Sequence, residues 1–171
     1  EAKRRIAYGL RLYYECKNKK TAKVKIFGDC GNLDSIQKYS NAVSGWTTNP
    51  SILRKGGVTD YLGFAKEAAS LVSPYPISFE VFADEMDEME RQAHVLASVS
   101  ENINVKIPVM NTKGMSTEGV VRSLTSSGIV VNVTAIFTEE QCLTASEAMG
   151  GNRGYLSIFA GRISDTLVDP V

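Results

Sequence analysis

The stretch of sequence that decides the fold is ENINVKIPVM, residues 101–110. Ile103, Val105 and Ile107 alternate with Asn104 and Lys106, and this period of two predicts a β-strand with one apolar and one polar face. A strand that is covered on both faces is expected to be apolar on both. The polar face, and Lys106 above all, therefore needs a purpose other than packing.

Outward from this stretch, apolar strand patterns alternate with helical patterns along the chain. The expected strands are 22–29, 44–49, 76–83, 102–108, 129–137 and 154–161, and the expected helices are 33–42, 59–72, 84–99, 116–128 and 138–150. Asn32, Thr59 and Thr138 are candidate N-caps, and Pro50 and Ser51 are expected to open a turn. Strict alternation of strands and helices predicts right-handed βαβ units and a parallel sheet.

Polar residues share one face of each predicted strand and gather toward its carboxyl end. They are Asp29, Asn49, Glu80, Lys106, Asn132, Thr134 and Ser157. A doubly wound sheet would bury apolar residues on both faces, and neither a G-x-G-x-x-G nor a P-loop motif supports that fold. A (β/α)8 barrel explains the pattern, because its inward residues form the active site at the carboxyl ends of the strands. We therefore predict a (β/α)8 TIM barrel in which these side chains converge.

An amine among carboxylates suits covalent catalysis on a carbonyl compound. Lysine attacks a carbonyl as the neutral amine, a form that burial favours, and neighbouring carboxylates can move the protons as water is lost. The alternative for Lys106 is a buried ion pair with Asp29 or Glu80.

Composition excludes several other classes of function. The 171 residues carry 19 basic and 19 acidic side chains, so nothing favours a nucleic-acid partner or an anionic membrane surface. No apolar run approaches the roughly 20 residues that a membrane span needs. Cys16, Cys30 and Cys142 form neither a metal-ligand pattern nor a disulfide framework, and we expect free thiols in a reducing cytoplasm. The single histidine, His94, lies in a helical pattern, so histidine triads and histidine metal sites are not expected.

Six motifs occur in order from about residue 23 to the end of the chain. They are GDCGNL (28–33), GWTTNPSIL (45–53), ISFEVFAD (77–84), NVKIP (104–108), NVTAIFT (132–138) and LSIFAGRISD (156–165). Together they resemble the successive motifs of the short-form transaldolase family, a group that includes the fructose-6-phosphate aldolases. The resemblance implies a barrel of the class I aldolase type that needs neither a metal nor another cofactor.

The resemblance also implies a role for each matching residue. Lys106 would form a Schiff base with a ketose phosphate, Asp29 would assist proton transfer during C–C cleavage, and Glu80 and Thr134 would hold the catalytic water. The implied substrate-binding residues are Thr48, Asn49, Asn132, Ser157, Phe159 and Arg162. A guanidinium suits a phosphate on chemical grounds as well, and the alternative for Arg162 is a surface salt bridge.

Two positions bear on the choice between transfer and simple aldol cleavage. Family members that favour transfer resemble this chain in having Glu80 and Phe159, where the aldolases tend to have Gln and Tyr. The expected function is therefore a transaldolase that moves a dihydroxyacetone unit from sedoheptulose 7-phosphate or fructose 6-phosphate to an aldose phosphate, in the pentose phosphate pathway. The alternatives are a fructose-6-phosphate aldolase and a catalytically silent barrel segment. The chain departs from the family pattern at Cys30, at Ile158 and in a longer loop at 108–116.

The expected domain organisation is a helix over residues 1–21, which packs on the barrel or ends an upstream segment, followed by a barrel domain over 22–171. Six βα units are apparent where a barrel needs eight, so we expect the chain to be part of a longer protein. The expected partners are sugar-phosphate substrates, and assembly into a homo-oligomer is a further hypothesis.

Overall fold

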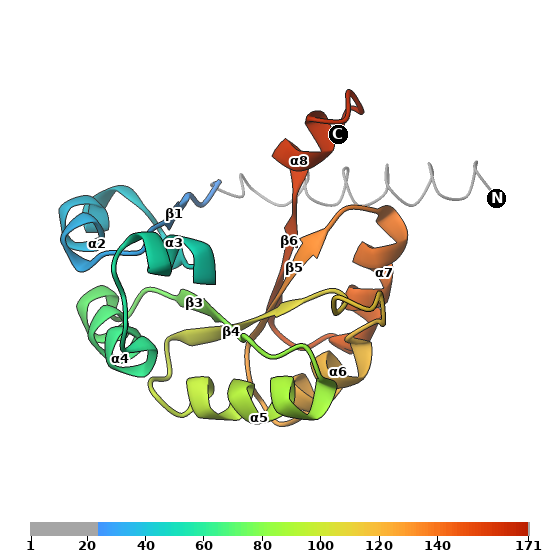
Figure 1. Cartoon of the computed structure of the whole chain (residues 1–171), viewed down its shortest axis with the longest axis horizontal. Coiled ribbons are helices and arrows are strands. Elements are labelled where there is room, and N and C mark those ends of the chain that lie inside the picture. Colours follow the sequence, from blue (N-terminus) through green and yellow to red (C-terminus); the bar gives the residue numbers. More distant parts are fainter. Residues whose placement is uncertain (1–23, 171) are drawn as a thin grey trace.

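The structure of the chain, a computed structural model, describes residues 24–170. The helix predicted over 1–21 and Cys16 lie outside the described residues. Six strands form one parallel sheet in the order of the sequence (Figure 1). They are β1 (Phe27–Asp29), β2 (Gly45–Thr47), β3 (Ile77–Glu80), β4 (Ile103–Pro108), β5 (Val131–Ile136) and β6 (Gly154–Ile158).

Helices connect the successive strands, and one short helix follows the last strand. They are α2 (Leu33–Tyr39) with the 3-10 helix η1 (Ser40–Ala42), α3 (Pro50–Lys55), α4 (Tyr61–Val72), α5 (Met86–Ala97), α6 (Glu118–Ser126), α7 (Glu139–Ala148) and α8 (Ala160–Ser164). No helix within residues 24–170 is long and apolar enough to cross a bilayer.

Two of the predicted N-caps are confirmed and one is wrong. The Asn32 side chain accepts a hydrogen bond from the Ser35 N–H, and Thr138 forms a capping box at the start of α7. The cap of α4 is Asp60 and not Thr59, because the Asp60 carboxylate accepts from the Gly63 N–H at 3.0 Å. Two adjacent residues of cap-forming type could not be ranked from the sequence.

Two short helices were not predicted. The turn expected at Pro50 is the first turn of α3, with proline at a position where its missing N–H costs nothing. The strand expected over 154–161 ends at Ile158, and α8 follows. Helices of five or six residues carry too little periodicity to stand out in a sequence.

The architecture is an incomplete (β/α)8 barrel, as predicted. A doubly wound sheet reverses its strand order at a switch point, whereas this sheet runs from β1 to β6 without reversal. Helices α4, α5, α6 and α7 lie along its convex side (Figure 1). The concave side is the lumen of the barrel, which six of the eight βα units surround in part.

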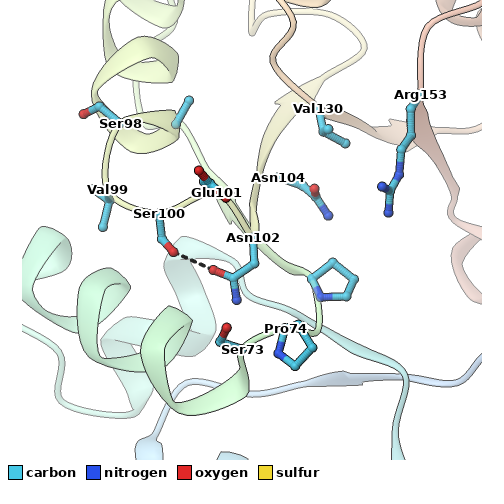
Figure 2. A pocket seen from close by; sticks show the side chains of 12 residues that line it. Ser73, Pro74, Ser98, Val99, Ser100, Glu101, Asn102, Asn104, Val130 and Arg153 are labelled. Carbon is cyan, nitrogen blue, oxygen red and sulfur yellow. Dashed lines mark hydrogen bonds between the residues drawn. The ribbon is translucent and has the colours of Figure 1, made fainter.

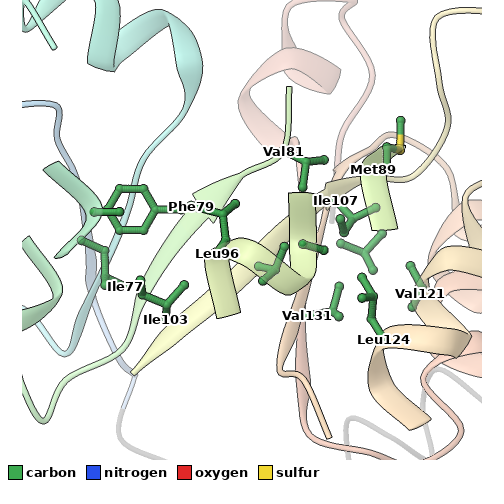
Figure 3. Close-up of a cluster of buried hydrophobic side chains, with 14 of the residues drawn as sticks. Ile77, Phe79, Val81, Met89, Leu96, Ile103, Ile107, Val121, Leu124 and Val131 are labelled. Carbon is green, nitrogen blue, oxygen red and sulfur yellow. The ribbon is translucent and has the colours of Figure 1, made fainter. Parts of the chain in front are cut away.

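The hydrophobic core lies between the convex face of the sheet and the helices (Figure 3). Ile103, Val105 and Ile107 of β4 are all buried in it, which confirms the side predicted for them. Met89 of α5 and Leu124 of α6 are buried in the same cluster. Burial of each such side chain contributes about 1.5–3 kcal/mol, so this layer stabilises the strands that carry the polar residues.

Two aromatic side chains meet across the lumen. Phe27 of β1 and Tyr155 of β6 pack edge to face, with ring centroids 5.7 Å apart. Phe27 lies opposite Gly45 in the register of β1 and β2, and a Cβ at that glycine would overlap the phenyl ring. Gly45 therefore makes room for an inward aromatic ring that joins the first and last described strands.

Candidate active site

Lys106 lies near the carboxyl end of β4 with its side chain in the lumen. The residue is only 7% exposed, and its register partner on β3 is Glu80. The Nζ atom lies 3.3 Å from Glu80 Oε2 and donates a hydrogen bond to the Thr48 carbonyl at 3.2 Å. The ion pair considered from the sequence is thus present with Glu80. An amine held between a carboxylate and a carbonyl can form a carbinolamine and pass protons to the carboxylate.

A second polar network crosses the lumen beside this pair. The Asn132 side chain donates from Nδ2 to Ser78 Oγ at 3.1 Å and accepts at Oδ1 from Ser157 Oγ at 2.7 Å. The three residues belong to β5, β3 and β6, so the network fixes the orientation of an amide between two hydroxyls. Sequence reasoning placed Ser78 on the inward face with Glu80 but did not include it in the site.

Thr134 of β5 has a buried hydroxyl without a partner. The residue is 1% exposed, and no group within residues 24–170 forms a hydrogen bond with Oγ1. It follows Asn132 on the inward face, opposite Pro108 in the register. A buried hydroxyl that lacks a hydrogen bond is costly, so Oγ1 is suited to hold a water molecule or a substrate hydroxyl.

Asp29 ends β1 on the same side of the sheet. Its Oδ1 atom accepts a hydrogen bond from Thr47 Oγ1 at 3.0 Å, and the residue is exposed to solvent. Thr47 therefore orients the carboxylate, a contact that follows from the parity of β1 and β2 and was not predicted.

Thr48 and Asn49 have clear roles in the fold. The Thr48 hydroxyl is fully buried and donates to the Ser78 carbonyl at 2.9 Å. The Asn49 side chain caps α3 by accepting from the Ile52 N–H at 3.0 Å. Substrate contact by these two residues stays a prediction.

Phe159 and Arg162 follow β6. The Phe159 ring packs edge to face against Phe137, with centroids 5.5 Å apart. Arg162 lies on α8 with a side chain that is 75% exposed, and its guanidinium is 3.7 Å from Asp165 Oδ2. The surface salt bridge considered for Arg162 is present, and no contact of the described residues joins Arg162 to the network around Lys106. Phosphate binding by Arg162 stays a prediction.

Tyr61, the first residue of α4, supports the site from the convex side. Its hydroxyl donates to the Glu80 carbonyl at 2.6 Å, and its ring packs against Phe79 and Phe82. Burial, and secondarily the Glu80 carboxylate, raises the pKa of Tyr61 well above its usual value. The hydroxyl thus remains a donor and holds the end of β3 in place. Nothing in the sequence singled this residue out.

The loop after β4 is tied to the loop after β3. Asp84 accepts hydrogen bonds from the N–H and the hydroxyl of Thr112, each at 2.7 Å, and these bonds lower the pKa of the carboxyl group. The longer loop noted at 108–116 is therefore ordered by contacts at the same end of the barrel as Lys106. Within residues 24–170, no group of three or more His, Cys, Asp or Glu side chains is placed to hold a metal ion.

Residues 26–170 match the family model described as Transaldolase/Fructose-6-phosphate aldolase. The chain is 39% identical over 148 residues to a "Probable transaldolase" of Thermoanaerobacter sp. (strain X514), an alignment that covers 85% of this chain and 64% of the relative. Proteins of the same description are 40% identical over 150 residues in Desulforapulum autotrophicum (85% of this chain, 65% of the relative) and 38% identical over 144 residues in Methanococcus maripaludis (strain C5) (83% and 63%).

The chain spans less than two thirds of the length of these relatives. The matched region nevertheless includes every strand of the sheet and every residue of the lumen network. The sequence motifs, the parallel barrel strands and the match to the family model agree. The chain therefore belongs to the transaldolase/fructose-6-phosphate aldolase family.

Proposed function

We propose that the chain carries transaldolase chemistry and transfers a dihydroxyacetone unit between sugar phosphates through a Schiff base on Lys106. The observation that carries the proposal is the buried Lys106 amine, 3.3 Å from the Glu80 carboxylate at the carboxyl ends of the strands. Active sites of such barrels lie at this end. Ketose phosphate donors and aldose phosphate acceptors would place the protein in carbohydrate metabolism. The location that we propose is the cytoplasm, because free cysteines are typical of a reducing compartment.

The first step joins the donor to the enzyme. The neutral Nζ of Lys106 attacks the C2 carbonyl of the ketose phosphate, and the carbinolamine then loses its hydroxyl as water to leave an iminium ion. In this scheme Glu80, whose Oε2 lies 3.3 Å from Nζ, takes the amine proton and returns it to the departing hydroxyl. The hydroxyl of Thr134 has no other partner among the described residues and would hold that water.

The second step breaks the C3–C4 bond. Asp29 takes the proton of the C4 hydroxyl, the electron pair of the bond flows to the iminium nitrogen, and an aldose phosphate leaves. The enamine left on Lys106 then attacks the aldehyde carbon of the acceptor, whose oxygen recovers the proton from Asp29. Addition of water releases the product ketose and the free amine. Asn132 and Ser157 would hold the donor hydroxyls in this scheme.

Phe159 favours transfer over simple cleavage. Release of free dihydroxyacetone requires that the enamine carbon be protonated, and a phenyl ring carries no acidic hydrogen for this step. In our proposal the enamine therefore persists until an aldehyde acceptor arrives. Thr48, Asn49 and Arg162 complete the proposed substrate contacts.

Borohydride trapping tests the Schiff base. The chain is incubated with fructose 6-phosphate and reduced, and the adduct is located by peptide mass spectrometry. We expect one adduct on Lys106, none in Lys106→Met, and an unchanged adduct in Lys113→Met, because Lys113 is a surface lysine paired with Glu85. No adduct on Lys106 would overturn the proposal and leave the residue as a buried ion-pair partner in a catalytically silent barrel.

An acceptor assay separates transfer from cleavage. Addition of erythrose 4-phosphate to the fructose 6-phosphate reaction should yield sedoheptulose 7-phosphate. Free dihydroxyacetone that accumulates equally with and without the acceptor would identify a fructose-6-phosphate aldolase instead. Phe159→Tyr should shift the products toward free dihydroxyacetone, because it supplies the missing hydroxyl.

A further inference from the structure

A cavity of about 670 Å³ opens at the end of the barrel opposite to Lys106 (Figure 2). Its lining includes inward positions where β3, β4, β5 and β6 begin: Pro76, Asn104, Val130 and Arg153. The loops 73–74 and 97–102 form its rim. The lower lumen of such a barrel is ordinarily filled by bulky branched side chains, so a polar cavity here needs an explanation.

Asn104 is the first group that points to a ligand. It lies two residues before Lys106 on the same face of β4 and is only 4% exposed. Its Nδ2 atom has no hydrogen-bond partner among residues 24–170. A buried amide donor without an acceptor is rare in folded proteins, and Asn104 lines the cavity directly.

Arg153 is the second such group. It directly precedes β6 and is exposed to solvent, unlike Asn104, and no hydrogen bond or ion pair joins its guanidinium to another described residue. Figure 2 shows the guanidinium and the Asn104 amide directed toward the same space. A planar guanidinium binds a carboxylate through two parallel hydrogen bonds, and the amide N–H adds a donor from the wall.

The other polar groups of the cavity limit the charge and the form of the ligand. Glu101 at the rim offsets the single charge of Arg153, which favours a monoanion over a dianionic phosphate. The Asn102 amide is already used, because Nδ2 donates to the Ala69 and Tyr75 carbonyls and Oδ1 accepts from Ser100. The hydroxyl oxygen of Ser100 retains acceptor capacity for a ligand hydroxyl.

From these observations we propose that the cavity binds a small hydroxylated carboxylic acid, with the carboxylate between Arg153 and Asn104 and the hydroxyls toward Ser100. This site is separate from the Lys106 site and does not depend on the reaction proposed there. It uses the amino-terminal mouth of the lumen, whereas the Lys106 network occupies the carboxyl-terminal mouth.

NMR titration of the isotope-labelled chain tests the proposal. Gluconate is the probe, glucitol is the neutral probe of the same carbon skeleton, and inorganic phosphate tests for simple charge recognition. We expect gluconate to shift the Asn104 side-chain amide and the Arg153 Nε–H signals to saturation, and glucitol to leave both unchanged. Arg153→Gln should weaken binding by about tenfold or more, and Arg122→Gln, a change at an exposed arginine of α6, should not.

Several results would overturn the proposal. They are an equal response to glucitol, an equal affinity for phosphate, an affinity that Arg153→Gln leaves unchanged, and shifts confined to the Asn132 amide at the other end of the lumen. Asn104→Val provides a second variant. Its amide donor is unpaired in the free protein, so the change should weaken gluconate binding while the chain keeps its stability.

Discussion

Thr48 and Thr134 form a matched pair that tests the account of the buried polar groups. Both are at most 1% exposed, and replacement by valine keeps the shape of each side chain. The Thr48 hydroxyl donates to the Ser78 carbonyl at 2.9 Å, whereas the Thr134 hydroxyl has no partner among the described residues. The two substitutions should therefore have different effects on the free energy of unfolding.

The expected change in the free energy of unfolding for Thr48→Val follows from the contacts of the Ser78 carbonyl. This carbonyl also accepts the Thr48 backbone N–H at 3.0 Å, so Thr48→Val does not leave it unsatisfied. The expected loss is one neutral hydrogen bond, about 1 kcal/mol. Thr134→Val removes no hydrogen bond within the described chain and relieves the burial of an unpaired hydroxyl, so stability should be unchanged or higher.

Urea unfolding followed by the fluorescence of Trp46, the single tryptophan of the chain, measures the difference. With a slope of about 2 kcal/mol per molar urea, Thr48→Val should lower the midpoint by about 0.5 M, and Thr134→Val should not lower it. Equal losses in the two variants, at unchanged slope, would refute the reasoning. The Thr134 hydroxyl would then have a partner inside the folded protein.

Three further predictions follow from single contacts. Asn49→Ala should lower stability by about 1 kcal/mol through loss of the α3 cap. Asn49→Asp should keep stability in urea unfolding and, as a test of the proposed substrate contact, reduce the proposed transfer reaction. Tyr61 has a raised pKa in the folded state, so the stability it contributes is fully present below about 10, the pKa of an unfolded tyrosine, and is lost as the pH rises from there toward the higher folded-state pKa. Tyr61→Phe should lower the free energy of unfolding by about 1 kcal/mol at neutral pH, because the hydrogen bond to the Glu80 carbonyl is lost. As the pH is raised into the alkaline range, the urea midpoint of this variant should fall less than that of the parent chain. Gly45→Ala would drive a methyl group into the Phe27 ring and should lower the free energy of unfolding by about 1–3 kcal/mol. Calorimetry should show a lower Tm, and an unchanged Tm would contradict this prediction.

The barrel could be predicted because side-chain parity is a strong constraint. In β4 and β5 the alternating apolar residues Ile103, Val105, Ile107, Val131 and Val133 are buried against the helices, as expected. The alternation ends at Ala135, which has a positive φ where the register of β5 and β6 shifts and is only partly buried. The first strand was predicted too long, over 22–29 where β1 spans Phe27–Asp29. Val24 and Ile26 are largely exposed, because β1 pairs with β2 alone and no described helix covers this end. An apolar run at a sheet edge cannot be distinguished by its sequence from one in the middle.

The sequence also predicted which side chains converge in the lumen, but not how they pair. Parity together with strand register brought Glu80 beside Lys106 and Asn132 beside Ser157, and both pairs are in contact. It could not show which hydroxyl pairs with which amide, because that depends on side-chain torsions. The bond from Tyr61 to the end of β3 was likewise out of reach, since it links a helix start to a strand end across the core.

The distribution of polarity in the lumen argues for function on energetic grounds. A buried ion pair such as Lys106 and Glu80 must repay the loss of hydration of both ions, and two apolar side chains of similar size are often as stable or more stable. The unpaired Thr134 hydroxyl and the unpaired Asn104 amide also cost stability where they stand. The convex face of the same strands carries no such groups, although it is buried just as deeply. Polar groups that weaken the fold, confined to the face that lines one lumen, are what binding and catalysis require and what packing alone would not retain.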